Sequence, residues 1–378
     1  MCASVRAQVN SGSDGSDGAF NPTTNTVINM SDHPNGIYQY TSVNIPGGVT
    51  VTFIPNENNS PVTWLVQNSV VINGTVDVSG QNAVGAVAGS GGPGGWSGGS
   101  GGSNPSSGQG PGGGGINPGS GNVYAGTGAF GAQGRTSGVY HGLDGQVYGN
   151  IFLLPLLGGS GGGGSAYGCG GGGGGGAILI ATRNSIELNG NIFGPGGSGG
   201  VVGGGGYYGG GGSGGGVRLV TSNIKGNGSI SANSGGGIFY GGLGRVRIDT
   251  YVNNFSGIIT GILTQGSQFV IGTVAVGLPQ LTVTGVGGVA ISAPSTGALS
   301  TPDAVLSAQQ NNPIQVVVSC ANLPLSTQIT VSIKPANGAA ISATGYNTTG
   351  TVASSTATIS IVIPRGGGLI YATAATSN

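Results

Sequence analysis

Seven consecutive glycines, Gly170 to Gly176, end directly at the strand-like segment Ala177 to Ile180. Glycine has the greatest backbone freedom of any residue, and ordering it costs up to about 1 kcal/mol more than ordering alanine. The chain carries 88 glycines among 378 residues, so an ordered fold must offset a large loss of backbone entropy. Whether these tracts are flexible or packed therefore decides what the chain can fold into.

Glycine-rich, low-complexity segments commonly form flexible linkers, which is the alternative to packing. Disorder favours high charge and few aromatic residues. This chain has only 9 basic and 9 acidic residues, and aromatic residues lie within its glycine tracts: Trp96, Tyr167, Tyr207, Tyr208, Phe239 and Tyr240. We therefore expect ordered tracts. Their missing side chains would let polyproline-II-like backbones approach and hydrogen-bond to one another, as in polyglycine packing.

The segments that flank the tracts repeat a common unit, which is a strand, a polar step, a second short strand and then Asn-Gly or Ser-Gly. The unit ends at Gly74, Gly190, Gly228 and Gly257, and Gly48 closes a related first segment. Strands that recur every few tens of residues are typical of a parallel β-helix or a similar β-solenoid. We expect Val, Ile and Leu to stack inward, Asn and Gly to form corners because both tolerate positive φ, and the glycine tracts to leave from one side of each coil.

An ordinary antiparallel sandwich is the alternative for residues 38–275, since Asn-Gly also marks two-residue hairpins. It fits single strand pairs such as Ile186 to Ile192, but it does not explain why each pair is followed by a glycine tract. The prediction is an all-β chain in which residues 1–37 are a leader with the first strand region and residues 38–277 are a glycine-rich β-solenoid.

Composition changes after about Gly277, where glycine thins out and Thr, Ser, Val and Ala rise. In this region Ile329, Val331 and Ile333 alternate with polar residues that include Lys334, which is typical of a half-buried strand. The region contains seven candidate strands: 281–286, 288–292, 313–320, 328–334, 339–346, 355–364 and 369–374. Seven short strands in about 100 residues predict an immunoglobulin-like sandwich over residues 278–378.

Four stretches carry a resemblance to known proteins: GSDGAFNP (15–22), NIPGGVTVTF (44–53), INGTVDVSG (72–80) and GGGGGGAILIA (171–181). With these, nearly the whole chain resembles a group of glycine-rich exported proteins of environmental bacteria. The resemblance implies a β-solenoid with glycine-rich insertions followed by a C-terminal sandwich, and it implies no chemistry. The tracts are also similar in composition to the polyglycine helices of phage adhesins and insect antifreeze proteins.

Charge and sequence patterns exclude several function classes. A net charge of zero, with Arg245 and Arg247 as the nearest approach to a basic cluster, argues against nucleic acid as a partner. No apolar run approaches the length of a membrane span. Cys2, Cys169 and Cys320 show no disulfide or zinc spacing. The composition favours an extracellular or cell-surface location, with a signal peptide missing or upstream.

Catalytic machinery is not apparent. His33 lies in an expected turn and His141 in an insertion, so neither is placed beside an obvious nucleophile. The carboxylates of Asp77 and Glu187 are the pair most able to meet on neighbouring coils, as a β-helical glycosidase or lyase would need. Asp14 and Asp17 could offer oxygens to calcium, but they lack the run of acids of a calcium loop, and a flexible polar leader is the preferred explanation. We expect no enzymatic activity and no other cofactor.

The aromatic residues of the tracts are the remaining candidates for a binding surface. Five are candidate contacts for a glycan or a partner chain: Trp96, Tyr207, Tyr208, Phe239 and Tyr240. The alternative is that they form a small core that caps the glycine tracts. Low charge favours close self-association. The expected function is therefore a non-enzymatic, self-assembling structural or surface protein of a fibre, sheath or surface layer; an adhesin ranks second, with ice binding and polysaccharide lysis as further alternatives.

Overall fold

The computed structural model describes residues 9–116, 125–134, 142–202, 207–236, 239–267, 269, 271, 279–291, 302–335 and 339–374, without the side chains of Val202 and Tyr207. These residues form an all-β structure whose one helical element, among those described, is the short 3₁₀ turn η1 (Met30–Asp32). The expected fold class is confirmed at this level. Predictions for His141 lie outside the described residues.

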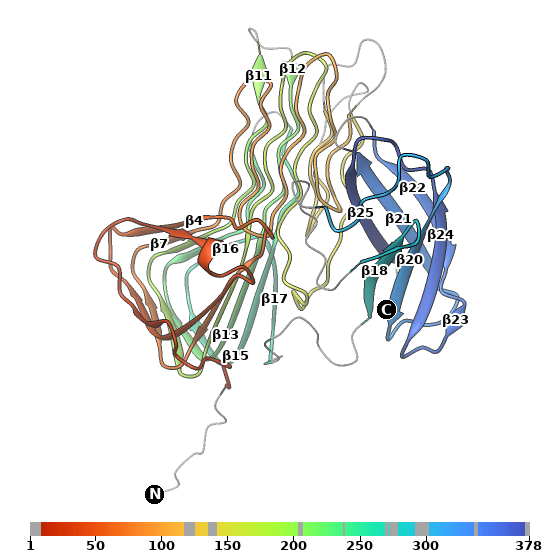
Figure 1. Cartoon of the computed structure of the whole chain (residues 1–378). Helices are drawn as coiled ribbons and strands as arrows, with labels where there is room; N and C mark the ends of the chain where they lie inside the picture. Colours follow the sequence, from red (N-terminus) through yellow and green to blue (C-terminus); the bar gives the residue numbers. More distant parts are fainter. Residues whose placement is uncertain are drawn as a thin grey trace, which may run out of the picture.

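Parallel strands form the first part of the molecule, here called the parallel stack (Figure 1). Nine strands make one sheet in the order β17-β15-β13-β8-β5-β3-β6-β9, with β1 beside β3. Six make a second sheet in the order β16-β14-β10-β7-β4-β2. The strands are β1 (Gly18–Phe20), β2 (Thr26–Asn29), β3 (Ile37–Ile45), β4 (Thr50–Ile54), β5 (Val62–Val66), β6 (Val70–Ile72), β7 (Thr75–Asp77), β8 (Ala177–Thr182), β9 (Ser185–Leu188), β10 (Asn191–Phe193), β13 (Gly216–Gly226), β14 (Ser229–Ser231), β15 (Arg245–Phe255), β16 (Ile258–Thr260) and β17 (Ile262–Gly266).

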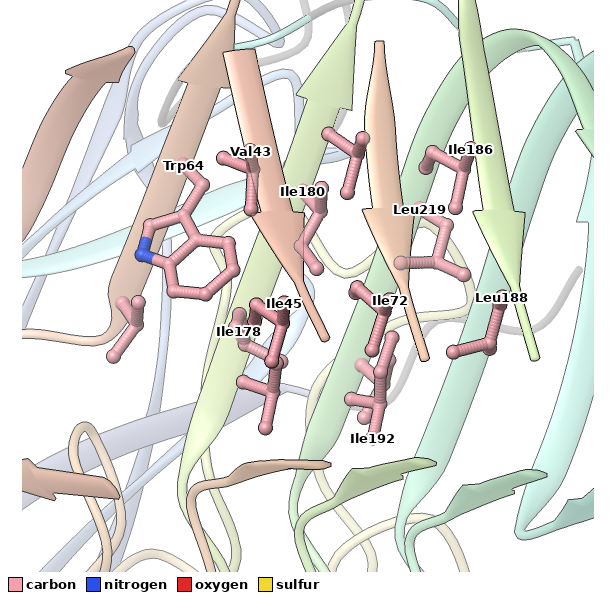
Figure 2. Close-up of a cluster of buried hydrophobic side chains, with 14 of the residues drawn as sticks. Val43, Ile45, Trp64, Ile72, Ile178, Ile180, Ile186, Leu188, Ile192 and Leu219 are labelled. Carbon is pink, nitrogen blue, oxygen red and sulfur yellow. The ribbon is translucent and has the colours of Figure 1, made fainter. Parts of the chain in front are cut away.

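Inward-facing side chains stack in columns from one turn of the chain to the next. Trp64 is opposite Ile180, which is opposite Leu219, and all three side chains are fully buried. Figure 2 shows Ile45 and Ile72, from neighbouring strands of the same sheet, pointing into this interior. Burying one aliphatic side chain contributes about 1.5–3 kcal/mol, so the columns supply the main driving force for this part of the fold.

The outer face of the larger sheet is also covered, which explains the continuous apolar run of β8. Leu179 and Ala181 point outward and pack with Val9, Val220 and Leu156. All six residues of β8 are therefore buried. A strand buried on both faces has a continuous hydrophobic sequence in place of an alternating one.

Asn-Gly corners align as expected but for a different reason. Gly74, Gly190, Gly228 and Gly257 lie one above the other, because the residues that follow them are paired in register. None of the four has a positive φ. A Cβ at Gly190 would overlap the carbonyl oxygen of Gly74, and the same holds at the next two corners. Close backbone approach therefore requires glycine at these four corners, whereas Gly48, which closes the first segment, has a φ of +83° and bears out the expected conformational freedom.

The glycine tracts form a body of their own, here called the glycine bundle, from described residues within 78–176, 194–215 and 232–244. Each segment leaves the parallel stack after β7, β10 or β14 and returns at β8, β13 or β15. In Figure 1 these segments project from one side of the stack, with the hairpin of β11 (Val201–Val202) and β12 (Tyr207–Tyr208) at the free end. The tracts thus leave from one side of each coil, as expected.

The central tract, Gly170 to Gly176, hydrogen-bonds with a period of three residues. Successive N–H groups donate to three different neighbouring segments, 78–85, 96–99 and 210–213, over 2.7–3.0 Å. The carbonyl groups of Gly170 to Gly175 accept from three further segments, 89–92, 159–162 and 197–200, and that of Gly176 accepts from the N–H of Gly216. A polyproline-II backbone has three residues per turn and no internal hydrogen bonds. Its N–H groups therefore point outward in three directions, and its C=O groups point in three others.

Six neighbours explain why the central tract consists of glycine alone. All seven residues are buried, and a Cβ on any of them would overlap backbone atoms of a neighbouring segment. The peripheral segment Gly194–Gly200 has the sequence GPGGSGG, and its non-glycine residues Pro195 and Ser198 are half-buried at its outer side. Side chains are therefore tolerated where no neighbouring segment lies.

The C-terminal pair of sheets, residues 280–374, is antiparallel throughout. One sheet has the order β19-β18-β20-β24-β23 and the other β22-β21-β25. They face each other across one core, which includes Val316, Val318, Ile329, Val331 and Ile359. The strands are β18 (Gln280–Val286), β19 (Val289–Ala290), β20 (Ile314–Ala321), β21 (Gln328–Pro335), β22 (Ile341–Tyr346), β23 (Thr349–Gly350), β24 (Ser355–Ile361) and β25 (Gly368–Ala374).

Candidate functional site

The five aromatic candidates do not form one exposed patch. Tyr208 packs edge-on against Phe239, whose side chain is 3% exposed, with ring centroids 6.0 Å apart. Trp96 lies elsewhere and packs against Tyr148. Tyr240 is 54% exposed. Tyr207 is described only by its backbone in β12. The pairing of Tyr208 with Phe239 is that of a small core in the bundle, which was the alternative to a binding surface.

An apolar surface that the sequence did not indicate lies at the free end of the glycine bundle. The turn of residues 84–87 exposes Val84 and Val87 by 76% and 70%, and Val201 is 54% exposed. Backbone hydrogen bonds connect the turn of residues 84–87 with the segment before Val201. The N–H of Gly170 donates to the carbonyl of Gly85, and the carbonyl of Gly170 accepts from the N–H of Gly200. Only the tertiary path of the tracts brings these residues together, so no local sequence signal could have found the surface.

A second set of aromatic and polar side chains joins the glycine bundle to the C-terminal sheets. The hydroxyl group of Tyr371 accepts a hydrogen bond from the Gly110 N–H over 2.9 Å, and its ring packs edge-on against Trp96. Burial raises the pKa of the Tyr371 hydroxyl. Trp96 is therefore a docking contact between two parts of the same chain.

Lys334 was expected on the polar face of its strand, but only 5% of it is exposed. Its ammonium group donates to the carbonyl oxygen of Gly113 in the glycine bundle. Burial lowers the pKa of this amine from 10.5 to about 8. The alternation of β21 is correct, but its solvent face is covered by another part of the chain, which strand periodicity cannot reveal.

We expect the free energy of unfolding to rise between pH 8 and 9.5. In this range the unfolded chain keeps Lys334 protonated, whereas the folded chain releases the proton, so stability increases with pH. With the pKa lowered to about 8, the gain is on the order of 2 kcal/mol. Denaturant titrations at pH 7, 8, 9 and 9.5 measure it. Lys334→Met should remove this rise, and an equal rise in that variant would contradict the assignment.

A buried ion cluster lies on the outer face of the larger sheet. The Asp249 carboxylate pairs with Arg218 at 3.3 Å and with Arg247 at 2.6 Å, and the three side chains are 0%, 1% and 5% exposed. Arg247 also lies 5.3 Å from the ring centre of Phe152. Burial lowers the pKa of Arg218, and Asp249 offsets part of this effect. Arg247, one of the two residues nearest to a basic cluster in the sequence, is therefore a buried structural residue.

The carboxylates considered for catalysis do not come together. Asp77 is paired in register with Phe193, whereas Glu187 is paired with Val71, so the expected stacking of Asp77 on Glu187 is wrong. Glu187 instead binds Lys225 at 2.7 Å, and this contact lowers the pKa of the Glu187 carboxyl. The two acids lie at different positions in the repeat, because Asp77 is in β7, after the corner at Gly74, whereas Glu187 is in β9, before the corner at Gly190.

The acidic residues near the N-terminus also have protein partners. Asp17 accepts a hydrogen bond from the Gln39 N–H and lies 3.3 Å from the His33 ring nitrogen. The backbone N–H of Ser16 donates to the carboxylate of Asp14 and lowers its pKa. Both carboxylates order the turn that precedes β1.

Further features that would indicate chemistry are not found in the described part of the chain. It contains no group of three or more His, Cys, Asp or Glu side chains that could hold a metal ion. A shallow hollow beside the N-terminal segment is lined by polar side chains that include Ser13, Gln67 and Asn68. Cys169 and Cys320 are buried thiols. Among the described residues, no helix has the length and apolarity to cross a membrane.

The candidate residues are divided between internal packing contacts and exposed surface. Among the described candidates, Trp96, Tyr208 and Phe239 pack within the molecule, whereas Tyr240 and the apolar residues at the free end of the bundle are exposed. Comparison of the chain with protein-family models, with curated proteins and with solved structures finds no significant match.

Proposed function

We propose that this chain is a non-enzymatic, exported structural or cell-surface protein that assembles with copies of itself. In this proposal the parallel stack is a β-solenoid, the glycine bundle is a polyglycine-II-like lattice, and the C-terminal pair of sheets is an immunoglobulin-like spacer or docking domain. The chain is a member of the glycine-rich exported group that its sequence resembles.

The in-register pairing of the parallel strands supports the β-solenoid. Each turn of the chain adds one rung to both parallel sheets, and the corner glycines stay aligned over four rungs. The spacing of three in the bundle, with six neighbours around one tract, is the arrangement expected of packed polyproline-II-like chains. In the C-terminal part, two antiparallel sheets enclose one core within about 100 residues.

One observation carries the functional part: the glycine bundle is a solid lattice of backbone. Residues 158–165 and 169–176 are all buried, and backbone hydrogen bonds join each segment to several neighbours around it. Between the described segments backbone packs against backbone so closely that a Cβ would not fit, and such packing favours a stiff body. Rigidity combined with very low surface charge suits a component of a fibre, sheath or surface layer, because little electrostatic repulsion opposes close contact.

An adhesin is the second candidate, and the exposed apolar residues at the free end of the bundle favour it. A rigid stalk that presents Val84, Val87 and Val201 at its end would suit contact with a partner surface, and exposed apolar patches often mark such sites. Tyr240, 54% exposed on the bundle, remains a candidate contact from the aromatic set.

Electron microscopy of the purified protein at increasing concentration, with sedimentation analysis alongside, tests the proposal. We expect filaments or sheets that grow with concentration. Strictly monomeric protein at millimolar concentration would contradict self-assembly. An adhesin that acts alone would stay monomeric and bind a surface or glycan array, with loss of binding on changing Val84 and Val87 to Ser.

A further inference from the structure

The core of the parallel stack is sealed along its length but open at its two ends. Twenty-six buried residues form this core, and five more apolar residues pack on it without being fully buried. Those five are Phe20, Ile28, Phe53, Phe255 and Ile259. Phe20, Ile28 and Phe53 lie in the first two turns of the stack, and Phe255 and Ile259 lie in the last full turn. Both ends therefore leave core side chains in contact with solvent.

Strand edges at the same two ends are unpaired in the part of the chain that the structure describes. At the first end, β2 pairs only with β4 and β1 only with β3. At the last end, β16 pairs only with β14. β17 covers the first half of β15 and leaves residues 250–255 with a partner on one side. An unpaired strand edge offers a row of N–H and C=O groups to another chain.

The strand edges themselves carry few of the residues that usually protect an edge, although Asp17 precedes β1 and Pro22 lies between β1 and β2. Residues 18–29 and 250–260 contain no charged side chain, and neither β2 nor β16 contains proline. Val27 in β2 is 60% exposed and Ile258 in β16 is 71% exposed. Natural sheets commonly blunt their edges with charged residues, proline or a cover.

We infer that the two ends bind each other in successive copies of the chain, so that the parallel stack continues head to tail from one molecule into the next. This inference rests on the proposed self-assembly and names its interface. The last edge, β16 with residues 250–255 of β15, meets the first edge, β2 with β1. Phe255 and Ile259 of one copy then close the core against Phe20 and Ile28 of the next.

A second copy is the occupant that matches both edges at once. All strands of the stack are parallel, so a following copy presents its first strands in the direction that the last strands require. The register follows from the existing columns. One inward column runs through Thr26, Val51, Val76, Ile192, Ile230 and Ile259, and one outward column through Val27, Thr52, Asp77, Phe193, Ser231 and Thr260. Continuation places Thr260 of one copy opposite Val27 of the next.

Because the two ends differ, the contact is heterologous and does not close on itself by symmetry. A heterologous contact of this kind generates a ring or an open filament. Parallel stacking along one axis gives the open form. A dimer in which two like ends meet would instead set strands antiparallel across the joint and would oppose Val27 to Val27.

Disulfide trapping tests this interface in the full-length chain. Val27→Cys and Thr260→Cys are made singly and together in a Cys2→Ser background, and the proteins are oxidised and separated without reductant. Neighbouring positions on paired strands lie within the range that a disulfide bridges. We expect the double variant to give a ladder of dimers, trimers and higher species. A mixture of the two single variants should stop at dimers, and each single variant alone should stay monomeric.

Charged substitutions at Val27 and Thr260 test the same contact without disulfide chemistry. Lysine at both positions, Val27→Lys with Thr260→Lys, should raise the concentration needed for assembly by about fivefold. Val27→Lys with Thr260→Glu should restore it. Val87→Lys is the matched control, because the Val87 side chain is 70% exposed and lies at the free end of the glycine bundle, away from both stack ends. This variant should leave assembly unchanged.

The outcomes separate this interface from the proposed function. Filaments without a disulfide ladder, or dimers of the Val27→Cys variant alone, would overturn head-to-tail stacking and leave self-assembly standing. Absence of any assembly at high concentration would overturn both. Thermal unfolding of each variant, compared with the unmodified chain, shows that a lost ladder does not come from a lost fold.

Discussion

Gly174→Ala is expected to lower the free energy of unfolding by about 3 kcal/mol or more, since overpacking a rigid interior costs about 1–3 kcal/mol and occasionally more. A Cβ at this position would overlap the carbonyl group of Gly159. Gly174 also donates to the Trp96 carbonyl and accepts from the Gly92 N–H, so the tract cannot shift without breaking hydrogen bonds to two neighbours. Guanidinium unfolding followed by circular dichroism measures the loss.

Two glycines serve as matched controls. At Gly194, which belongs to the same bundle, the nearest atom to an added Cβ is a methyl group of Val78 at 3.4 Å, and at Gly47 the nearest atom lies 4.0 Å away. Neither has a positive φ. Gly194→Ala and Gly47→Ala should therefore change stability by less than about 1 kcal/mol, or stabilise the chain by limiting the unfolded state. Equal effects at all three positions would show that the tract is not packed.

Asp249→Asn should destabilise the chain by about 3–5 kcal/mol, as is typical when one member of a buried ion pair is removed. The substitution keeps the size of the side chain but leaves Arg218 and Arg247 without their shared negative charge in a place where all three groups are at most 5% exposed. Two buried guanidinium groups would then repel each other. The free energy of unfolding at neutral pH is the measurement.

Glu187→Gln is the control for this prediction. Glu187 and Lys225 form an exposed ion pair, with 34% and 49% of their side chains accessible. Exposed pairs contribute about 0–1 kcal/mol because water and salt screen them. Glu187 and Asp249 belong to strands of the same nine-stranded sheet. A similar loss of unfolding free energy for both variants would mean that the Asp249 cluster is solvated and not buried as described.

Local patterns predicted strands better than they predicted burial. Every candidate strand after residue 280 corresponds to an observed strand, because period-two alternation is a property of neighbouring residues. The same alternation assigned Lys334 to solvent, but the glycine bundle covers it. Likewise, β8 reads as a continuous apolar run, and only the tertiary contacts with the segments that contain Val9 and Leu156 explain why its outer face is buried.

Site prediction from the sequence failed where pairing between distant segments decides the neighbours. Asp77 and Glu187 looked as though they could stack, yet the register sets them against different residues. For Tyr208 and Phe239 the sequence left a binding patch and a small core open, and their edge-on packing is that of the core. Val84, Val87 and Val201 are unremarkable in sequence and become neighbours only because Gly85, Gly170 and Gly200 are hydrogen-bonded.

The sequence by itself determined the all-β class, the positions of the corners and the need for packed glycine, because these follow from residue size, charge and spacing along the chain. Only the tertiary structure decided which six segments surround Gly170–Gly176, which charges are buried and which core residues remain open at the ends of the stack. The physical reason is that a glycine carries no side chain to specify a partner. Its neighbours are chosen collectively, by backbone hydrogen bonds and close contact that exist only once the whole lattice has formed.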